Sequence, residues 1–415
     1  MIENKIIIGF IFETTPESGG NFQTDISTAI RLKNLKLKNF DIKFFSSNKK
    51  NLEILRKYNF EVKFIKNKNF NLNFIKFFHL LTNTNFKKVI NFIFRFDSFE
   101  KKLLSENVDF MHFNQMSPLA LLLKKIDYGV TFWDMAHLDY PIFPESKNNY
   151  YSTYAREFIY KFLSDNSFYI VTDCEENKTN FSKRYNTKKN KISIIYSEPS
   201  SQIKKNYNKN VSMENKIIEK LKLKDKRFIF YPAQYWAHKN HIYILEGLQI
   251  LKNKYNKIIN AIFCGSDKDN LDYLKSICEK LDLNDQVEFF NFLNEDEIYN
   301  LYKHSFAIIV PTYFGPTNHL PIEGFYFEKP VFYSNIFSDN EQVKDGVIEI
   351  ELKDPNDLAE KLLKLSDDNS FLEKYKLKSK EKYKDLTIKI DKSKNTFREL
   401  FERYKILKIK FNNKK

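Results

Sequence analysis

The sequence predicts an α/β protein of two similar domains, each built around a mostly parallel sheet, with a helical tail at the C-terminal end. Three observations support this prediction. The chain has 415 residues, which is too many for one ordinary hydrophobic core. Short continuous apolar runs alternate with longer segments of helical periodicity, as in β–α–β units with buried strands. The polar segment 197–210 interrupts this alternation, which then starts again.

The expected strands are the short apolar runs, most of them separated by helical stretches. In the first domain, residues 1–200, they are 6–12, 40–45, 109–113, 130–133 and 169–172. In the second domain, residues 211–385, they are 228–231, 261–264, 287–290, 306–310 and 331–333. From about Pro355 the pattern is helical only, and residues 386–415 are expected to form a helical tail. Two such Rossmann-like domains would face each other across a cleft, with ligands at the carboxyl ends of the strands.

The composition is that of a folded protein in a reducing compartment. Hydrophobic residues make up 42% of the chain and charged residues 29%, a globular balance. The three cysteines form neither a Cys-x-x-Cys pair nor a Cys/His cluster, which argues against a disulfide scaffold or structural zinc. The first apolar run is too short for a signal peptide, and no stretch reaches the roughly 18 apolar residues of a membrane span. We therefore expect a cytoplasmic protein, with peripheral attachment to the inner face of the cytoplasmic membrane as a further expectation.

The net charge of +15 has two readings. Abundant Lys and Asn beside only 9 Gly indicate AT-rich codons, but a basic surface also attracts phosphates, nucleic acid or anionic lipid. In residues 60–104, Phe and Ile interleave with Lys and Arg, which suits a membrane-surface helix, a buried helix or a nucleic-acid surface. Since basic residues are spread along the whole chain without a recognisable motif, we expect no nucleic-acid partner.

One candidate binding stretch is YFGPTNHLPIEGFYFEKPV, residues 313–331, which follows an expected strand and opens a helix near Pro321. Proline suits the first helical turn, because its missing N–H would be unpaired there anyway. The free amides of that turn and the helix dipole form a site for a diphosphate. Glu323 is expected in the same turn, where it either caps the helix or accepts hydrogen bonds from ribose hydroxyls.

The second candidate stretch is YPAQYWAHKNH, residues 231–241, between a strand and a helix. Lys239, beside a helix N-terminus, is placed to neutralise a phosphate that gains charge as it leaves, although a lone Lys in this chain is usually solvated. Trp236, His238 and His241 are a candidate metal or acid/base cluster, for which loop packing is the commoner explanation.

These two stretches, with IFCGSD and the segment 287–312 between them, resemble family 4 glycosyltransferases, retaining enzymes of the two-domain GT-B type. The resemblance covers about residues 228–351 and, more weakly, the first domain. It implies that Glu323 binds the donor ribose, as the second of two family glutamates spaced eight apart. It also implies that Lys239 binds the donor phosphates.

Two positions depart from the family pattern. Gly315 stands where the first glutamate would fall, and Gln234 stands where the family has a phosphate-binding arginine. The resemblance then implies that the diphosphate is held by Lys239 and by amides around 318–320. The expected donor-binding residues are Gly19, Gly20, Gln234, Lys239, Asn318, His319, Leu320 and Glu323.

Two stretches of the first domain are also similar to the family. Gly19-Gly20 looks like its glycine loop after the first strand, where bare backbone approaches the donor, although a plain turn would look the same. TFWDMAHLDYP, residues 131–141, is similar to the His-Asp segment that borders the acceptor, with Trp133 in the usual His place. Asp134 and His137 are therefore candidate catalytic residues beside Lys239, and His137 is alternatively a core or capping histidine.

The resemblance implies a retaining glycosyltransferase of surface polysaccharide biosynthesis. Its expected partners are a nucleoside-diphosphate sugar, a glycan or lipid-linked acceptor and, through residues 60–104, an anionic membrane surface. No cofactor or metal is expected, because helix amides can replace the cation; Asp267 and Asp269, a D-x-D pair, are the alternative metal ligands. Two other functions stay open: an epimerase or phosphorylase of the same architecture, and an inactive GT-B domain that binds glycan or a partner protein.

Overall fold

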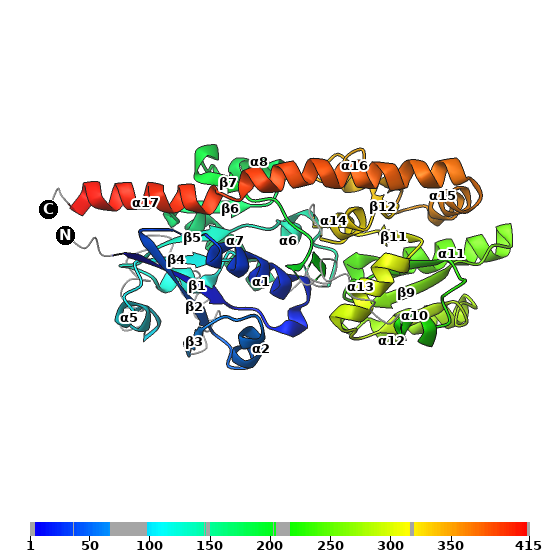
Figure 1. Ribbon diagram of the computed structural model, residues 1–415, viewed down its shortest axis with the longest axis horizontal. Helices are drawn as coiled ribbons and strands as arrows, with labels where there is room; N and C mark the ends of the chain where they lie inside the picture. The colour runs from blue at the N-terminus through cyan, green and yellow to red at the C-terminus, as the bar shows by residue number, and fades with distance from the viewer. Residues whose placement is uncertain are drawn as a thin grey trace. The chain divides into compact units, whose positions relative to one another are not determined.

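The computed structural model describes residues 5–35, 37–66, 98–144, 146, 150–201, 203–204, 216–315 and 319–412 (Figure 1). The chain divides into two compact units, each with one parallel sheet. The first unit comprises Met1–Leu138, Lys147–Ile195 and Asp391–Lys415. The second comprises Asp139–Ser146 and Tyr196–Ile390.

The first unit contains a seven-stranded parallel sheet in the order β3-β2-β1-β4-β5-β6-β7. Its strands are β1 (Ile6–Phe12), β2 (Phe40–Ser46), β3 (Val62–Phe64), β4 (Phe110–Phe113), β5 (Asp127–Thr131), β6 (Tyr169–Thr172) and β7 (Ile192–Ile194). In β1, Ile8 pairs with Ile42 on one side and Phe110 on the other. The strand order therefore reverses between β1 and β4, where ligands bind in open α/β sheets.

Helices cover this sheet because each presents an apolar stripe to it. In α1 (Gly20–Lys33) the buried stripe includes Phe22, Ile26 and Ala29, which are spaced for one face of a helix. The other helices are α2 (Asn51–Lys57), α5 (Ser98–Ser105), α6 (Ala136–Asp139), α7 (Tyr150–Asn166), α8 (Glu175–Tyr185) and α17 (Thr396–Asn412), with 3-10 turns η1 (Pro16–Ser18), η2 (Pro118–Leu122) and η3 (Lys189–Lys191).

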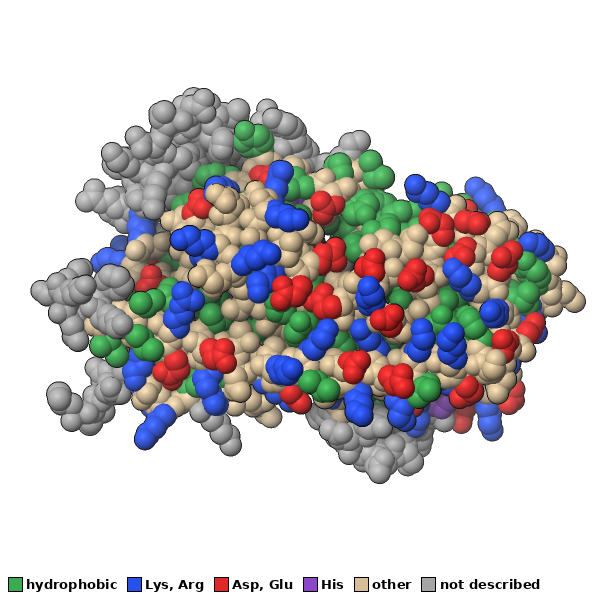
Figure 2. Space-filling view, turned by 90° about the horizontal axis from the view of Figure 1, so that it is seen from above, with side chains coloured by type: hydrophobic (Ala, Val, Ile, Leu, Met, Phe, Trp, Pro, Cys, Tyr) green, Lys and Arg blue, Asp and Glu red, His purple; other side chains and the backbone are tan. Residues whose placement is uncertain are grey.

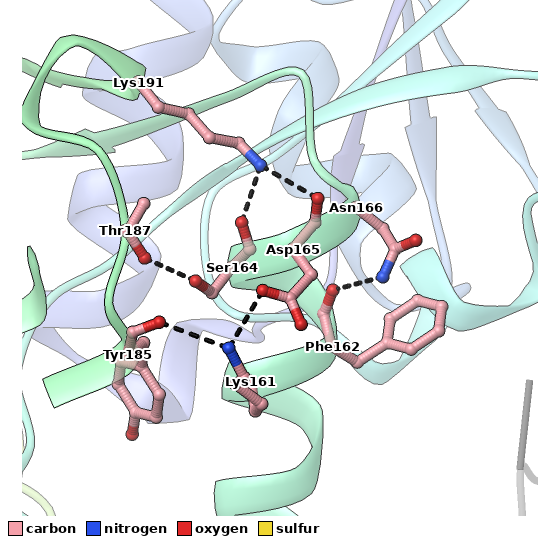
Figure 3. Close-up of polar contacts among 8 residues, drawn as sticks. All are labelled: Lys161, Phe162, Ser164, Asp165, Asn166, Tyr185, Thr187 and Lys191. Atoms are coloured by element: carbon pink, nitrogen blue, oxygen red, sulfur yellow. Dashed lines mark hydrogen bonds and ion pairs between the residues drawn. The ribbon is translucent and has the colours of Figure 1, made fainter.

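Lysines stabilise the C-terminal ends of α7 and α8, as Figure 3 shows. Lys191 Nζ donates to the carbonyl oxygens of Ser164 at 2.6 Å and Asp165 at 3.2 Å, in the last turn of α7. Lys161 Nζ donates to the carbonyl oxygen of Tyr185 at 3.3 Å, at the end of α8. These carbonyls have no partner within their helices, and a cation there also complements the helix dipole. The two helices are thereby tied to each other and to the chain entering β7.

The C-terminal helical tail, expected over residues 386–415, belongs to the first unit from Asp391 onward. The helix α17 buries Phe397, Phe401 and Tyr404 in a hydrophobic core of the first unit, beside residues of β1 and α1. The Tyr404 hydroxyl donates to the carbonyl oxygen of Asp109 at 3.1 Å. An amphipathic helix needs cover for its apolar face, and this sheet supplies it.

The second unit contains a six-stranded parallel sheet in the order β10-β9-β8-β11-β12-β13. Its strands are β8 (Phe228–Tyr231), β9 (Asn260–Cys264), β10 (Val287–Phe290), β11 (Ala307–Val310), β12 (Val331–Ser334) and β13 (Ile348–Ile350). Its helices are α10 (Lys216–Lys220), α11 (His241–Tyr255), α12 (Leu271–Lys280), α13 (Glu295–His304), α14 (His319–Tyr326), α15 (Pro355–Asp367) and α16 (Asn369–Ser393), with 3-10 turns η4 (Ala237–Lys239) and η5 (Asn335–Phe337). The strand order reverses between β8 and β11.

On the face in Figure 2, basic and acidic side chains are intermixed, so the positive net charge is not gathered in one patch there. In the part of the chain that the structure describes, every helix is too short or too polar to cross a membrane. Most of the basic, aromatic segment 60–104, namely residues 67–97, lies outside the described residues. The predicted membrane surface therefore stays a prediction.

Candidate functional site

The candidate site lies in the second unit, where the loops that follow β8 and β11 meet. The backbone N–H of Tyr313 donates to the carbonyl oxygen of His238 at 3.0 Å. The His238 ring stacks on Phe314 with 3.7 Å between ring centroids and 17° between planes. Two stretches far apart in the sequence, 231–241 and 313–331, are thus joined at the carboxyl ends of adjacent strands. This is the switch point of the sheet, where ligands bind in this class of fold.

Lys239 ends the short turn η4 directly before α11. Asn240, between them, has a left-handed backbone with φ 55°, and the Tyr231 hydroxyl donates to the carbonyl oxygen of Lys239 at 3.0 Å. A cation beside a helix N-terminus is unfavourable by itself, because the helix dipole is positive at that end. An anion bound between Lys239 and the first amides of α11 would turn this arrangement into a favourable one.

The histidines of this loop pack rather than form a metal cluster. His241 is buried, and its ring centroid lies 4.8 Å from that of Tyr231. Burial lowers the pKa of His241 to about 3, and the charge of Lys239 lowers it as well, so the ring is neutral at pH 7. Among the described residues, no group of three or more His, Cys, Asp or Glu side chains is arranged to hold a metal ion.

Gln234, a predicted donor-binding residue, has its side-chain amide hydrogen-bonded at both ends. Its Nε2 donates to Ser266 Oγ at 2.7 Å, and its Oε1 accepts from Trp236 Nε1 at 3.0 Å. Since Ser266 follows β9, Gln234 joins two loops at the same edge of the sheet. These two hydrogen bonds stabilise the loop that carries Lys239.

Glu323 lies deeper in its helix than predicted. In the described chain α14 begins at His319, so Glu323 belongs to the second turn and does not cap the helix. It is 6% exposed; its Oε2 accepts from the Tyr302 hydroxyl at 2.7 Å and its Oε1 from the Ser200 N–H at 3.2 Å. Burial raises the pKa of Glu323, whereas Tyr302, the charge of His319 and Ser200 lower it.

Three further donor-binding residues were predicted at the start of α14, namely Asn318, His319 and Leu320. His319 Nδ1 lies 3.1 Å from the carbonyl oxygen of Glu198, and Leu320 packs against the hydrophobic core of the unit. Asn318 lies outside the described residues. Gly315 has φ 88°, a backbone conformation that side chains other than glycine rarely adopt. A glutamate in this backbone conformation would be strained.

The site residues predicted in the first domain are two glycines at the start of α1 and two side chains, Asp134 and His137, near or in α6. Gly19 has φ 59° and directly precedes α1, and a Cβ at Gly20 would meet nothing within 4 Å. Asp134 Oδ1 accepts from the N–H of Ala136 at 2.9 Å, at the start of α6. His137 is buried, with Nε2 2.8 Å from Glu157 Oε1 on α7. These contacts suit the alternative in which His137 is a core histidine.

Sequence reasoning missed a buried polar network at the switch point of the first sheet. Directly after β1, Glu13 Oε2 accepts from the Ser117 hydroxyl at 2.7 Å. On α1, Asp25 accepts from Thr14 Oγ1 at 2.5 Å and Asn114 Nδ2 at 2.9 Å. Burial raises the pKa of Glu13 to about 7 and that of Asp25 to about 6. The sequence signal that could have revealed this network is the polar residues that follow the apolar runs of β1 and β4.

The alternative metal ligands have a structural role. Asp267 Oδ1 accepts from the N–H groups of Asn270 and Leu271, both at 3.1 Å, where α12 begins. Asp269 has a left-handed backbone with φ 62° in the same turn. The D-x-D pair therefore shapes the entry to α12.

Comparison with known proteins shows a likeness to glycosyltransferases. Residues 213–383 match the family model of glycosyl transferases, group 1. An uncharacterized glycosyltransferase of Methanocaldococcus jannaschii is 24% identical over 195 residues, 46% of this chain and 48% of that protein. The O-antigen chain mannosyltransferase RfbU of Salmonella typhimurium is 27% identical over 180 residues, 43% of this chain and 46% of that protein. The chain thus spans about half the length of these relatives.

Solved structures confirm the predicted fold class. A glycosyltransferase from Rickettsia africae has a TM-score of 0.67 at 17% identity, over 96% of this chain and 99% of that one. HepE of Anabaena, in complex with UDP and glucose, has a TM-score of 0.67 at 12% identity, over 96% and 100%. A UDP-N-acetylglucosamine 2-epimerase has a TM-score of 0.55 at 13% identity, over 90% and 91%. The chain has the GT-B fold, with two parallel α/β domains and C-terminal helices.

Proposed function

We propose that this protein is a glycosyltransferase that moves a sugar from a nucleoside-diphosphate sugar to a glycan or lipid-linked oligosaccharide, with retention at the anomeric carbon. The observation that carries the proposal is the contact between the loop that carries Lys239 and residues 313–314, which precede the Glu323 helix in the chain, at the carboxyl ends of β8 and β11. A cation beside the N-terminus of α11 suits a diphosphate, and the Glu323 carboxylate, in the second turn of α14, suits ribose hydroxyls. Both residues fall within the stretch that matches group 1 glycosyl transferases.

In the proposed reaction the bond between the anomeric carbon and the diphosphate oxygen breaks. The acceptor hydroxyl forms the new bond to that carbon, and its proton passes to the departing diphosphate. The charge that grows on the diphosphate is stabilised by Lys239 and by helix amides, and the binding groups align donor and acceptor. We expect surface polysaccharide as the product, since one relative is an O-antigen chain mannosyltransferase, and UDP as the first donor base to try, since HepE binds UDP.

A thermal-shift screen against UDP-, GDP-, ADP- and CMP-sugars tests the donor site. A donor that binds only the folded protein should raise the melting temperature, by an amount corresponding to about 2.7 kcal/mol when present at a hundred times its Kd. The hit is then incubated with candidate acceptors and the product analysed. If none of the four classes shifts the melting temperature, the proposed function is wrong.

We predict that transfer persists in excess EDTA. The helix amides near Lys239 supply electrostatics that a divalent ion supplies in metal-dependent transferases. Turnover is measured with EDTA, with added magnesium or manganese, and with neither. Turnover that disappears with EDTA and returns with either ion would contradict the metal-free mechanism and favour Asp267 and Asp269 as ligands.

A binding-only function is the second candidate, because Gly315 and Gln234 replace two family side chains. An inactive GT-B domain would bind glycan or a partner protein without turnover. Product analysis separates the possibilities: transferred sugar supports the proposal, an altered free nucleotide sugar indicates an epimerase, and binding without any product indicates the inactive domain.

A further inference from the structure

Tyr302 is a buried side chain aimed at the carboxylate of Glu323. It comes from α13, is 0% exposed, and its hydroxyl donates to Glu323 Oε2 at 2.7 Å. Its ring is packed edge-on against Phe230, 5.0 Å away at 85°, and face-on against Phe327, 5.4 Å away at 5°. A ring packed on both sides has little rotational freedom, so the hydroxyl is held in place by the core.

The second oxygen of Glu323 has a donor from a different part of the unit. The N–H of Ser200 donates to Oε1 at 3.2 Å. The same short segment accepts at Glu198 O, 3.1 Å from His319 Nδ1 at the start of α14. A carboxylate has about four acceptor positions, and Tyr302 together with the N–H and side chain of Ser200 does not fill all of them. Glu323 can therefore keep its protein partners and still accept a hydrogen bond from the ribose.

We propose that Tyr302 and the backbone amide of Ser200 are positioning groups, which orient the Glu323 carboxylate for the ribose of the donor. The inference rests on the proposed donor site and adds two residues to it. Both groups donate, so they stabilise the ionised carboxylate, the form that accepts hydrogen bonds from two hydroxyls. Neither residue belongs to the two sequence stretches that indicated the site.

The pH dependence of donor binding shows whether Tyr302 orients the Glu323 carboxylate or only supports the fold. Burial raises the pKa of Glu323; Tyr302, His319 on the same helix and Ser200 lower it. The titratable groups that act on Tyr302 are Glu323 and Cys264, at the end of β9. Removing the Tyr302 hydroxyl removes a lowering influence, so the pKa of Glu323 must rise. Binding should then be lost at a higher pH as the solution is acidified.

The experiment is calorimetric titration of UDP into the full-length protein and into Tyr302→Phe, between about pH 5 and pH 8. At pH 8 we expect UDP to bind about tenfold more weakly to the variant. On the acid side, the pH at which affinity is half lost should rise by about one unit. Ser200→Pro, which removes the other donor outside the core, should shift the profile in the same direction.

Tyr243→Phe is the matched control. Tyr243 is also a buried tyrosine of this unit, and its pKa is raised by burial and by the carboxylates of Asp357 and Asp354 rather than by Glu323. Its affinity for UDP and its pH profile should match those of the wild type. If the pH profile of UDP binding is unchanged in Tyr302→Phe while Glu323→Ala binds UDP weakly, the positioning role is wrong and the proposed donor site stands. Wild-type protein that binds no nucleotide would overturn the positioning role together with the proposed function.

Discussion

Replacing Glu323 by alanine should weaken UDP binding about 100-fold. Two hydroxyls of the ribose would lose hydrogen bonds to a charged acceptor, and each such bond contributes about 1.5–3 kcal/mol. A total of about 3 kcal/mol corresponds to roughly two orders of magnitude in Kd. Calorimetric titration of UDP into the purified variant measures this change. Wild-type affinity in Glu323→Ala would contradict the ribose assignment.

The same substitution should also lower the melting temperature, because the buried Glu323 carboxylate accepts hydrogen bonds from two other segments of the unit. Alanine leaves the Tyr302 hydroxyl and the Ser200 N–H without their carboxylate acceptor, and an unpaired buried donor costs about 1–3 kcal/mol. Glu323→Gln is the matched variant, since it keeps the volume and one carbonyl oxygen. We expect glutamine to retain most of the stability and to lose affinity, which separates the two roles of the carboxylate.

Lys239→Ala should reduce kcat by about 100-fold to 1000-fold, with a smaller effect on the binding of UDP. The charge that Lys239 stabilises grows as the bond to the diphosphate breaks, so the loss belongs to the transition state. Steady-state kinetics with the donor found by thermal shift give kcat and KM separately. Turnover within about threefold of wild type would mean that another group holds the diphosphate.

Lys268→Ala is the control for a general loss of positive charge near this loop. Lys268 Nζ lies 5.3 Å from the ring centroid of Trp236, on the loop that carries Lys239. It therefore contributes a similar charge without standing at the N-terminus of α11. We expect its turnover to stay within about threefold of wild type. Equal losses in the two lysine variants would indicate an unspecific electrostatic effect.

Except for the edge strand β10, the strands that sequence reasoning predicted have a neighbouring strand on both sides. β8 and β11, for example, are buried at every position and read as continuous apolar segments. The edge strands β3, β7 and β13 were missed, although they complete both sheets. Each has three residues, and β3 has no fully buried position. Such segments form strands because a neighbour pairs with them, which no local pattern records.

The residues of the proposed donor site also divide into those that the sequence predicted and those that it missed. Lys239 and Glu323 were predicted because each stands in a recognisable stretch with a strand before it and a helix after it. Tyr302 and Ser200 were missed, since one belongs to an ordinary amphipathic helix and the other to a polar linker. Gly315 was noted in the sequence only as a position without a carboxylate, whereas the structure shows that its backbone has φ 88°, which favours glycine.

Local hydrophobic periods of buried strands and helix stripes predicted the alternation of strands and helices, the two parallel sheets and the stretches that follow β8 and β11. The packing of α17 in the first unit became visible in the folded protein alone, as did the position of Glu323 beyond the first turn of its helix, with Tyr302 and Ser200 as partners. These features arise from burial and hydrogen bonding between distant segments, which depend on which surfaces meet. That information is distributed over the whole chain and is absent from any single stretch of it.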